Sequence, residues 1–190
     1  MRTFWVILLL VVISITSSCF IDGSFRGLYS YYEVTKSEYP NFIQKPGADL
    51  CELTSDDSII VYKINGSELK NCLRSEPKSL VYFWDPNCGA PFCVPPNFAQ
   101  EYSTEKNLEL FIVATYYDYS KMAVDYNLVR PVFGVDTEFY RTNLTDRYMK
   151  RFREDLFNGE LMEEEKPRFV LFHSDSLIAT SQDLEELEIQ

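Results

Sequence analysis

The apolar residues of this chain are concentrated in short continuous runs that predict β-strands. These runs span residues 58–64, 79–84, 108–116, 167–172 and 177–180. Two of them, 79–84 and 108–116, contain few polar side chains, which is typical of strands buried on both faces of a sheet. The sequence therefore predicts a sheet whose central strands are inaccessible to water.

Between these runs the spacing of apolar residues changes to that of helices. Residues 67–73 place three apolar side chains on one helical face. A second helix is expected to begin at Pro95 or Pro96, because proline suits a first helical turn, and to end near Lys106. A third helix is expected over 146–157.

The order of these elements predicts an α/β domain over residues 51–190, with a mixed central sheet flanked by helices. Residues 118–160 are interpreted as a helical insertion, interrupted at Pro131 and Gly134. The acidic tail from Gln182 favours a helix.

The N-terminus has the pattern of an export signal over residues 1–18. A short cationic start precedes an unbroken apolar run from Phe4 to Ile13, too short for a permanent helix across a hydrocarbon core of about 30 Å. Small residues then lead to Cys19 and resemble a bacterial lipobox, in which that cysteine is acylated. The alternative is an ordinary signal peptide followed by a chance cysteine.

If Cys19 carries lipid, residues 19–50 are a tether that becomes an irregular extension packed on the domain. The protein would then be a membrane-anchored lipoprotein, with no second hydrophobic anchor needed. No acidic run follows Cys19. By resemblance to bacterial sorting rules, this favours the periplasmic face of the outer membrane.

Composition and charge exclude several classes of function. Hydrophobic residues make up 46 % of the chain, enough for a sizeable core, and its formal net charge of −11 argues against binding nucleic-acid phosphates. Only one histidine is present, His173. A Ser-His-Asp hydrolase or a multi-histidine metal site is therefore not expected, and we expect no metal and no cofactor.

Four cysteines remain after Cys19, namely Cys51, Cys72, Cys88 and Cys93. An even number in an exported protein suggests disulfide pairing or redox chemistry, because the compartment is oxidising. For Cys51 and Cys72 we expect a structural role, either as buried thiols or as one disulfide that joins the extension to the first helix.

Two separated motifs resemble the thioredoxin superfamily. The strand Val81-Tyr82-Phe83-Trp84 leads through Asp85-Pro86-Asn87 to Cys88-Gly89, like that family's strand, turn and reactive cysteine. Later, Lys166-Pro167 precedes the run to Phe172, like the family's cis-proline loop and hairpin. The resemblance covers residues 58–184 and implies a thioredoxin-like fold, with 118–160 similar to the insertion of the membrane-tethered, redoxin-type branch.

The resemblance implies thiol chemistry on protein or peptide thiols and disulfides in the cell envelope. Cys88 would be the nucleophile and Cys93 the resolving thiol, since a helix start lowers the pKa of a nearby thiol and the thiolate is the reactive form. The other site residues implied are substrate contacts: Trp84, Pro86, Lys166 and Pro167, with the last in the cis form.

The spacing of the pair departs from the family pattern, because four residues rather than two separate Cys88 from Cys93. On one continuous helix, residues five apart lie about 8.6 Å apart at Cα, whereas a disulfide needs about 4.4–6.8 Å. A Cys88–Cys93 bond therefore requires a loop, which Pro91, Pro95 and Pro96 favour. The helix field at Cys88 would then be weaker.

Acidic neighbours also oppose activation of Cys88. Asp85 precedes it, and Glu160 and Glu163–Glu165 precede Lys166. Carboxylates near a thiol raise its pKa and would offset the effect of the helix start. For most of the four glutamates, the favoured alternative is a solvated acidic face.

Three classes of function follow. The first is a thiol–disulfide oxidoreductase, and the second is a thioredoxin-like binding or scaffolding module without redox turnover. The third, a redoxin-type peroxidase, ranks last because no activating threonine and arginine motif precedes Cys88.

Overall fold

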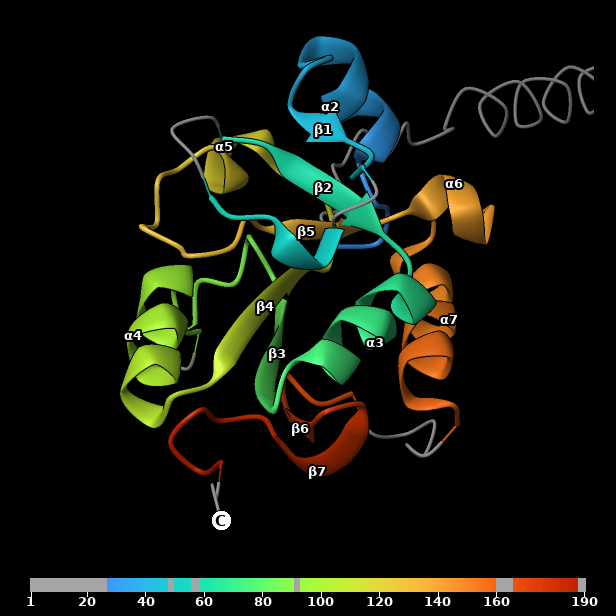
Figure 1. Cartoon of the computed structure of the whole chain (residues 1–190). Helices are drawn as coiled ribbons and strands as arrows, with labels where there is room; N and C mark the ends of the chain where they lie inside the picture. Colours follow the sequence, from blue (N-terminus) through green and yellow to red (C-terminus); the bar gives the residue numbers. More distant parts are fainter. Residues whose placement is uncertain (1–26, 48–49, 56–58, 91–92, 160–165, 188–190) are drawn as a thin grey trace, which may run out of the picture.

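A computed structural model describes residues 27–47, 50–55, 59–90, 93–159 and 166–187 of the 190 (Figure 1). Within these residues, seven strands form one mixed sheet in the order β1-β2-β5-β4-β3-β6-β7. Their bounds are β1 Ile43–Gln44, β2 Val61–Ile64, β3 Lys78–Trp84, β4 Glu109–Ala114, β5 Phe133–Val135, β6 Phe169–His173 and β7 Ser176–Ser181. The predicted mixed α/β architecture is confirmed.

The centre of the sheet consists of the two strands with the most continuous apolar runs. β3 pairs with β4 in parallel and with β6 in antiparallel register. Side chains along β3 alternate between two cores, because Leu80, Tyr82 and Trp84 belong to one buried cluster and Val81 and Phe83 to the other. This double burial explains why the run is almost wholly apolar.

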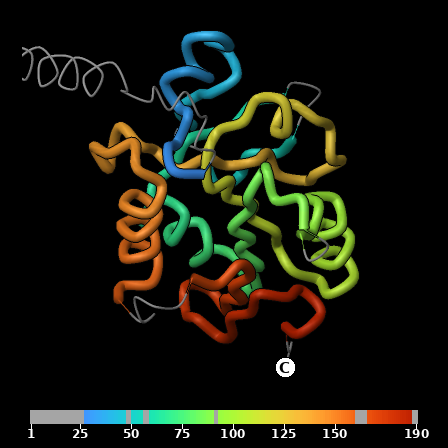
Figure 2. Tube along the Cα trace, turned by 180° about the vertical axis from the view of Figure 1, so that it is seen from behind, coloured from blue at the N-terminus to red at the C-terminus, as the bar shows by residue number. Residues whose placement is uncertain are grey.

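Helices cover both faces of the sheet (Figures 1 and 2). α4 packs on the face that carries the first cluster, and α3 and α7 pack together on the opposite face. The helical bounds are α2 Tyr32–Glu38, the 3-10 helix η1 Leu50–Glu52, α3 Gly66–Ser75, α4 Pro96–Lys106, α5 Tyr119–Met122, α6 Thr137–Tyr140 and α7 Thr145–Phe157. The predicted start of α4 at a proline is confirmed.

The interpretation of residues 118–160 as a helical insertion, interrupted at Pro131 and Gly134, is wrong at the second interruption. They contain β5, which lies in the sheet between β2 and β4 and pairs in parallel with both. β5 is only three residues long, Phe-Gly-Val. So short a run has no periodicity of its own, and its place depends on the edges of its two neighbours.

The extension before the domain is more regular than its sequence predicted. It carries α2 and the edge strand β1, which pairs in parallel with β2 through Ile43 and Val61. The Tyr32 ring in α2 lies 5.4 Å from the Tyr117 ring that follows β4. Tertiary contacts therefore order this segment.

The predictions for the C-terminal tail, the N-terminal segment and residues 160–165 have different outcomes. No helix occurs over the described tail residues 182–187, so the helical interpretation of that part is wrong. The signal segment 1–18, Cys19 and the acidic residues 160–165 lie outside the described residues.

Candidate functional site

Cys88 and Cys93 form a disulfide in a loop at the carboxyl end of β3. Their Cα atoms lie 5.8 Å apart. The Cys88 N–H donates to the Asp85 carbonyl at 3.1 Å, and the Cys93 N–H donates to the Ala90 carbonyl at 2.9 Å. Both cysteines are half-buried. The described residues 88–90 and 93–95 are thus outside any helix, which is the condition for this bond.

A polar network surrounds the start of the loop. The Asp85 carboxylate accepts hydrogen bonds from the Asn87 N–H at 2.9 Å and the Tyr116 hydroxyl at 2.7 Å. The Asn87 side-chain amide donates to the Asp118 carboxylate at 2.8 Å. Burial, and then the hydrogen bond to Asp85, raise the pKa of Tyr116. The phenol therefore stays protonated and holds Asp85 beside the loop.

Helix α4 starts beyond the cysteine loop in the chain. It begins at Pro96, capped by Pro95, and so lies closer along the chain to Cys93 than to Cys88. The field of a helix start falls off within about one turn. Neither proline has an N–H to donate.

Trp84 and Pro86, which were predicted to contact a substrate, lie beneath the surface. Trp84 is 5 % exposed, and its ring meets the Tyr126 ring edge-on at 5.6 Å. Pro86 is also buried. Because both side chains are buried, their exposure does not support the prediction that they contact a substrate directly.

Pro167 lies at the same edge of the sheet as the cysteine loop. The Phe83 N–H donates to the Arg168 carbonyl at 2.8 Å, which extends the β3–β6 pairing toward Pro167. No cis peptide bond occurs between described residues, so the expected cis form of Lys166–Pro167 is wrong. The bond adopts the trans isomer that X–Pro bonds favour by default.

Lys166 is exposed on the adjoining loop and makes a salt bridge to Asp146 at 3.1 Å. Its carbonyl accepts a hydrogen bond from the Gln182 amide at 2.8 Å. This pairing occupies the ammonium group of a residue that the sequence predicted to contact the substrate.

Cys51 and Cys72 form a second disulfide, with Cα atoms 5.0 Å apart, which joins η1 to α3. Cys72 is 1 % exposed. The Arg130 guanidinium reinforces this junction: it makes an ion pair with Glu76 at 3.1 Å and also bonds Glu109 and the Cys51 carbonyl. The setting is that of a structural disulfide.

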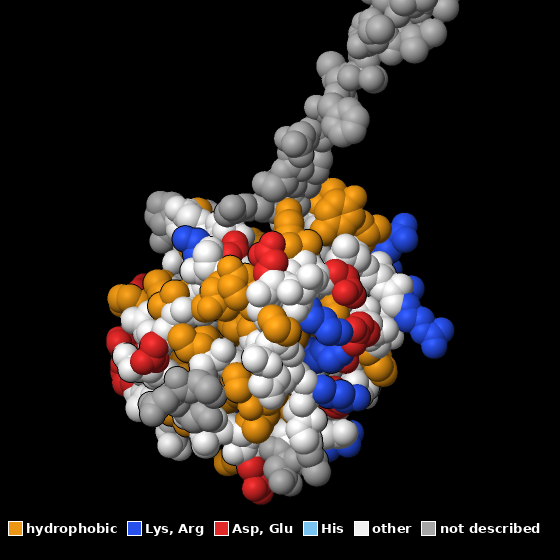
Figure 3. Space-filling view, turned by 90° about the horizontal axis from the view of Figure 1, so that it is seen from above, with side chains coloured by type: hydrophobic (Ala, Val, Ile, Leu, Met, Phe, Trp, Pro, Cys, Tyr) orange, Lys and Arg blue, Asp and Glu red, His pale blue; other side chains and the backbone are white. Residues whose placement is uncertain are grey.

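Two grooves flank the cysteine loop. One, of about 230 Å³, lies between α2 and the chain that follows β4, and its lining includes Asn87, Tyr39 and Tyr116. Figure 3 views the molecule from the side of α2 and shows hydrophobic side chains exposed over that face. The aromatic run 116–119 signals this groove in the sequence.

The second groove, of about 500 Å³, has Cys93 in its wall and lies between α4 and residues 183–185. Sequence reasoning missed it, because its two walls are far apart in the chain. Its one local signal is the exposed side of α4, where Phe98, Glu101 and Glu105 follow at helical spacing.

Among the described residues, each helix is too short or too polar to cross a bilayer. Nor does that part of the chain gather three His, Cys, Asp or Glu side chains in a way that could hold a metal ion.

Comparison with known proteins found no matching family model, no matching curated protein and no matching solved structure.

Proposed function

We propose that this protein is a thioredoxin-like thiol–disulfide oxidoreductase in which Cys88 is the nucleophile and Cys93 the resolving thiol. The observation that carries the proposal is a short-range disulfide in a half-buried loop at the carboxyl end of a central strand. Support also comes from Pro167 at the same sheet edge and from a mixed sheet in which β6 and β7 form an antiparallel hairpin.

In the reducing direction, the Cys88 thiolate attacks one sulfur of a partner disulfide. The partner S–S bond breaks, a Cys88–partner disulfide forms, and the departing partner sulfur takes up a proton. The Cys93 thiolate then attacks the Cys88 sulfur, closing the Cys88–Cys93 bond and releasing the second partner sulfur as a thiol. Two electrons pass from this protein to the partner, and a dithiol donor returns the pair to the reduced form.

Variants of the two cysteines test this order of events. Cys93→Ser is expected to accumulate mixed disulfides through Cys88, because the resolving thiol is missing, whereas Cys88→Ser is expected to accumulate none. Intact-mass analysis after incubation with a disulfide-bonded peptide measures both. The matched control is Cys51→Ala with Cys72→Ala, which should retain the exchange. Equal trapping by both single serine variants, or by neither, would contradict the assignment.

A redox-inactive binding module is the second candidate, and two features favour it. The Asp85 carboxylate accepts from the Asn87 N–H, next to Cys88 in the chain, and carboxylates near a thiol raise its pKa. The helix α4 begins only at Pro96, beyond the cysteine loop. For this candidate, the rate of Cys88 alkylation should rise with pH and reach its midpoint near pH 8.5, because the pKa of a free cysteine thiol is about 8.5. A midpoint at lower pH, together with disulfide reductase activity, would support the oxidoreductase over the binding module.

We propose further that the protein acts outside the cytoplasm as a lipoprotein anchored through Cys19. The support is the apolar segment before Cys19 and two disulfides among the described residues, which suit an oxidising compartment. Cys19→Ala should move the protein from the membrane to the soluble fraction. Unchanged partitioning would discard the anchor.

A further inference from the structure

The groove beside Cys93 combines an apolar floor with an exposed aromatic ring. Leu184 is 6 % exposed at its base, whereas Phe98 on α4 is 57 % exposed at its side. The Tyr102 hydroxyl donates to the Leu187 carbonyl at 3.3 Å, which ties α4 to the C-terminal segment. Both walls are therefore held in place while an apolar surface remains open to solvent.

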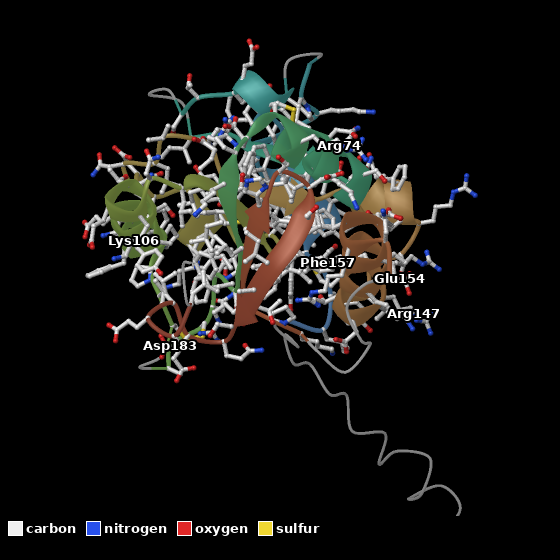
Figure 4. All side chains as sticks on the ribbon, turned by 60° about the horizontal axis from the view of Figure 1, so that its bottom comes forward. Arg74, Lys106, Arg147, Glu154, Phe157 and Asp183 are labelled. Atoms are coloured by element: carbon white, nitrogen blue, oxygen red, sulfur yellow. A yellow bond between two sulfur atoms is a disulfide. The ribbon has the colours of Figure 1, made fainter. Side chains whose placement is uncertain are left out.

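The charged side chains that line this groove are all acidic, and Lys106 lies next to them, with its ammonium group 5.9 Å from the Tyr102 ring. Neither Lys nor Arg is among the residues that line the groove. Four carboxylates do line it, those of Glu101, Glu105, Asp183 and Glu185. Within the described chain, only Glu105 of these has an ion pair, with Lys106 at 3.0 Å. Figure 4 labels Lys106 at the end of α4 and Asp183 on the facing segment.

The two features together define the chemistry of an occupant. A cation placed here meets three carboxylates that have no ion pair within the described chain, although Asp183 accepts a hydrogen bond from the Glu185 N–H at 3.0 Å. An apolar side chain covers Phe98 and Leu184. Lysine and arginine satisfy part of both requirements, because their stems pack on aromatic surfaces while their charged ends reach acids at the rim. A volume of about 500 Å³, open along α4, suits a few side chains of an extended segment.

We propose that this groove docks a basic, partly apolar polypeptide segment of the partner. The idea that the bound segment lies next to a reactive disulfide rests on the function proposed above. The binding of the segment to the groove does not rest on that function. A segment bound between α4 and residues 183–185 lies against Cys93, so it brings flanking cysteines to the disulfide. The groove therefore selects partners whose cysteines lie beside lysine or arginine and an apolar residue.

The test uses the full chain carrying Cys88→Ala and Cys93→Ala, so that no exchange can occur. The probe is a fluorescein-labelled, cysteine-free peptide in which one leucine is flanked by lysines, and anisotropy measures its binding. Affinity is expected to fall as salt rises, because the contacts are exposed ion pairs. The same peptide with glutamates in place of lysines should bind at least about tenfold more weakly.

Groove variants assign the binding to this surface. The double variant Glu101→Gln, Glu185→Gln and the single variant Phe98→Ser should each weaken binding about tenfold or more. The matched control is Glu38→Gln with Val34→Ser, which changes an acid and an exposed apolar residue in the groove beside α2. It should leave the affinity unchanged.

Equal affinity for the lysine and glutamate peptides would overturn the proposal, as would equal loss in the groove and control variants. Circular dichroism checks that each variant is folded. Because the test protein lacks both cysteines, a failed exchange reaction leaves the docking result intact. Conversely, failed docking leaves the cysteine-trapping result intact.

Discussion

Individual side chains hold the N-terminal segment on the domain through charge. Glu138 accepts a hydrogen bond from Lys36 in α2 at 2.8 Å and also pairs with Lys63 in β2. These contacts lower the pKa of Glu138 from 4.5 to about 2, with Lys36 the largest cause and Lys63 the second. The carboxylate thus links α2, β2 and α6.

Replacing Glu138 with Gln should give a pH-dependent loss of stability. Because folding lowers the pKa of Glu138, its contribution is complete above the unfolded value near 4.5 and disappears as pH falls through about 2. The side chain is 45 % exposed, so solvent screening limits the effect to about 1 kcal/mol or less. Urea unfolding of both proteins at several pH values checks this. A gap that widens toward low pH would contradict it.

Close packing at β5 makes Gly134 sensitive to substitution. A Cβ atom there would lie 2.5 Å from the ring and the hydroxyl oxygen of Tyr117. That ring is 2 % exposed, and its hydroxyl donates to the Val135 carbonyl at 2.9 Å, so it has no room to move. Gly134→Ala is expected to cost about 1–3 kcal/mol in denaturant unfolding. Gly47→Ala, which meets nothing within 4 Å, is the control and should change stability little.

At the scale of elements, some features of the fold are determined by neighbouring residues and others by contacts between residues far apart in the chain. α3 begins with a capping box, in which the Asn65 side chain accepts from the Glu68 N–H and Glu68 accepts from the Asn65 N–H. This start is readable in the sequence, because both partners lie within one turn. For Cys51 and Cys72 the sequence left two alternatives, buried thiols or one disulfide, because spacing alone does not determine disulfide connectivity. The structure selects the disulfide, which links η1 to α3.

The Cys51–Cys72 disulfide should contribute more stability than Cys88–Cys93. The sequence separations are 21 and 5, and a longer closed loop removes more entropy from the unfolded chain. Cys51→Ala with Cys72→Ala is expected to lose about 3 kcal/mol. The corresponding pair of changes at 88 and 93 is expected to lose about 1 kcal/mol less. Thermal and denaturant unfolding measure both, and the reverse order would contradict this account.

For the whole molecule, the N-terminal segment completes the sheet. β1 covers the edge of β2. Phe42, which precedes β1, is 4 % exposed and belongs to the same buried cluster as Leu80 and Tyr82. An uncovered, apolar sheet edge is a template for association with another chain. The extension is therefore part of the folded unit rather than a tether alone.

A chain that starts at residue 45 should be less stable and should self-associate. It loses the β1–β2 pairing and the burial of Phe42, and it exposes the side of Val61 that β1 covers. Size-exclusion chromatography with light scattering measures the association, with the full chain as the reference. A stable monomer of the shortened chain would show that this segment is dispensable.

Two features of the fold follow from the sequence alone, and for local reasons. Continuous apolar runs define β3 and β4, and paired prolines place the start of α4 beyond the cysteine loop. The four-residue spacing between Cys88 and Cys93 also determines that any bond between them lies in a loop.

Tertiary structure alone decided the rest. β5 joins the sheet because β2 and β4 offer it two open edges, and Lys166–Pro167 is trans although its motif resembles a cis-proline loop. The acidic groove exists only where α4 meets residues 183–185. These features depend on contacts between residues far apart in the chain, whose free energies no local pattern encodes.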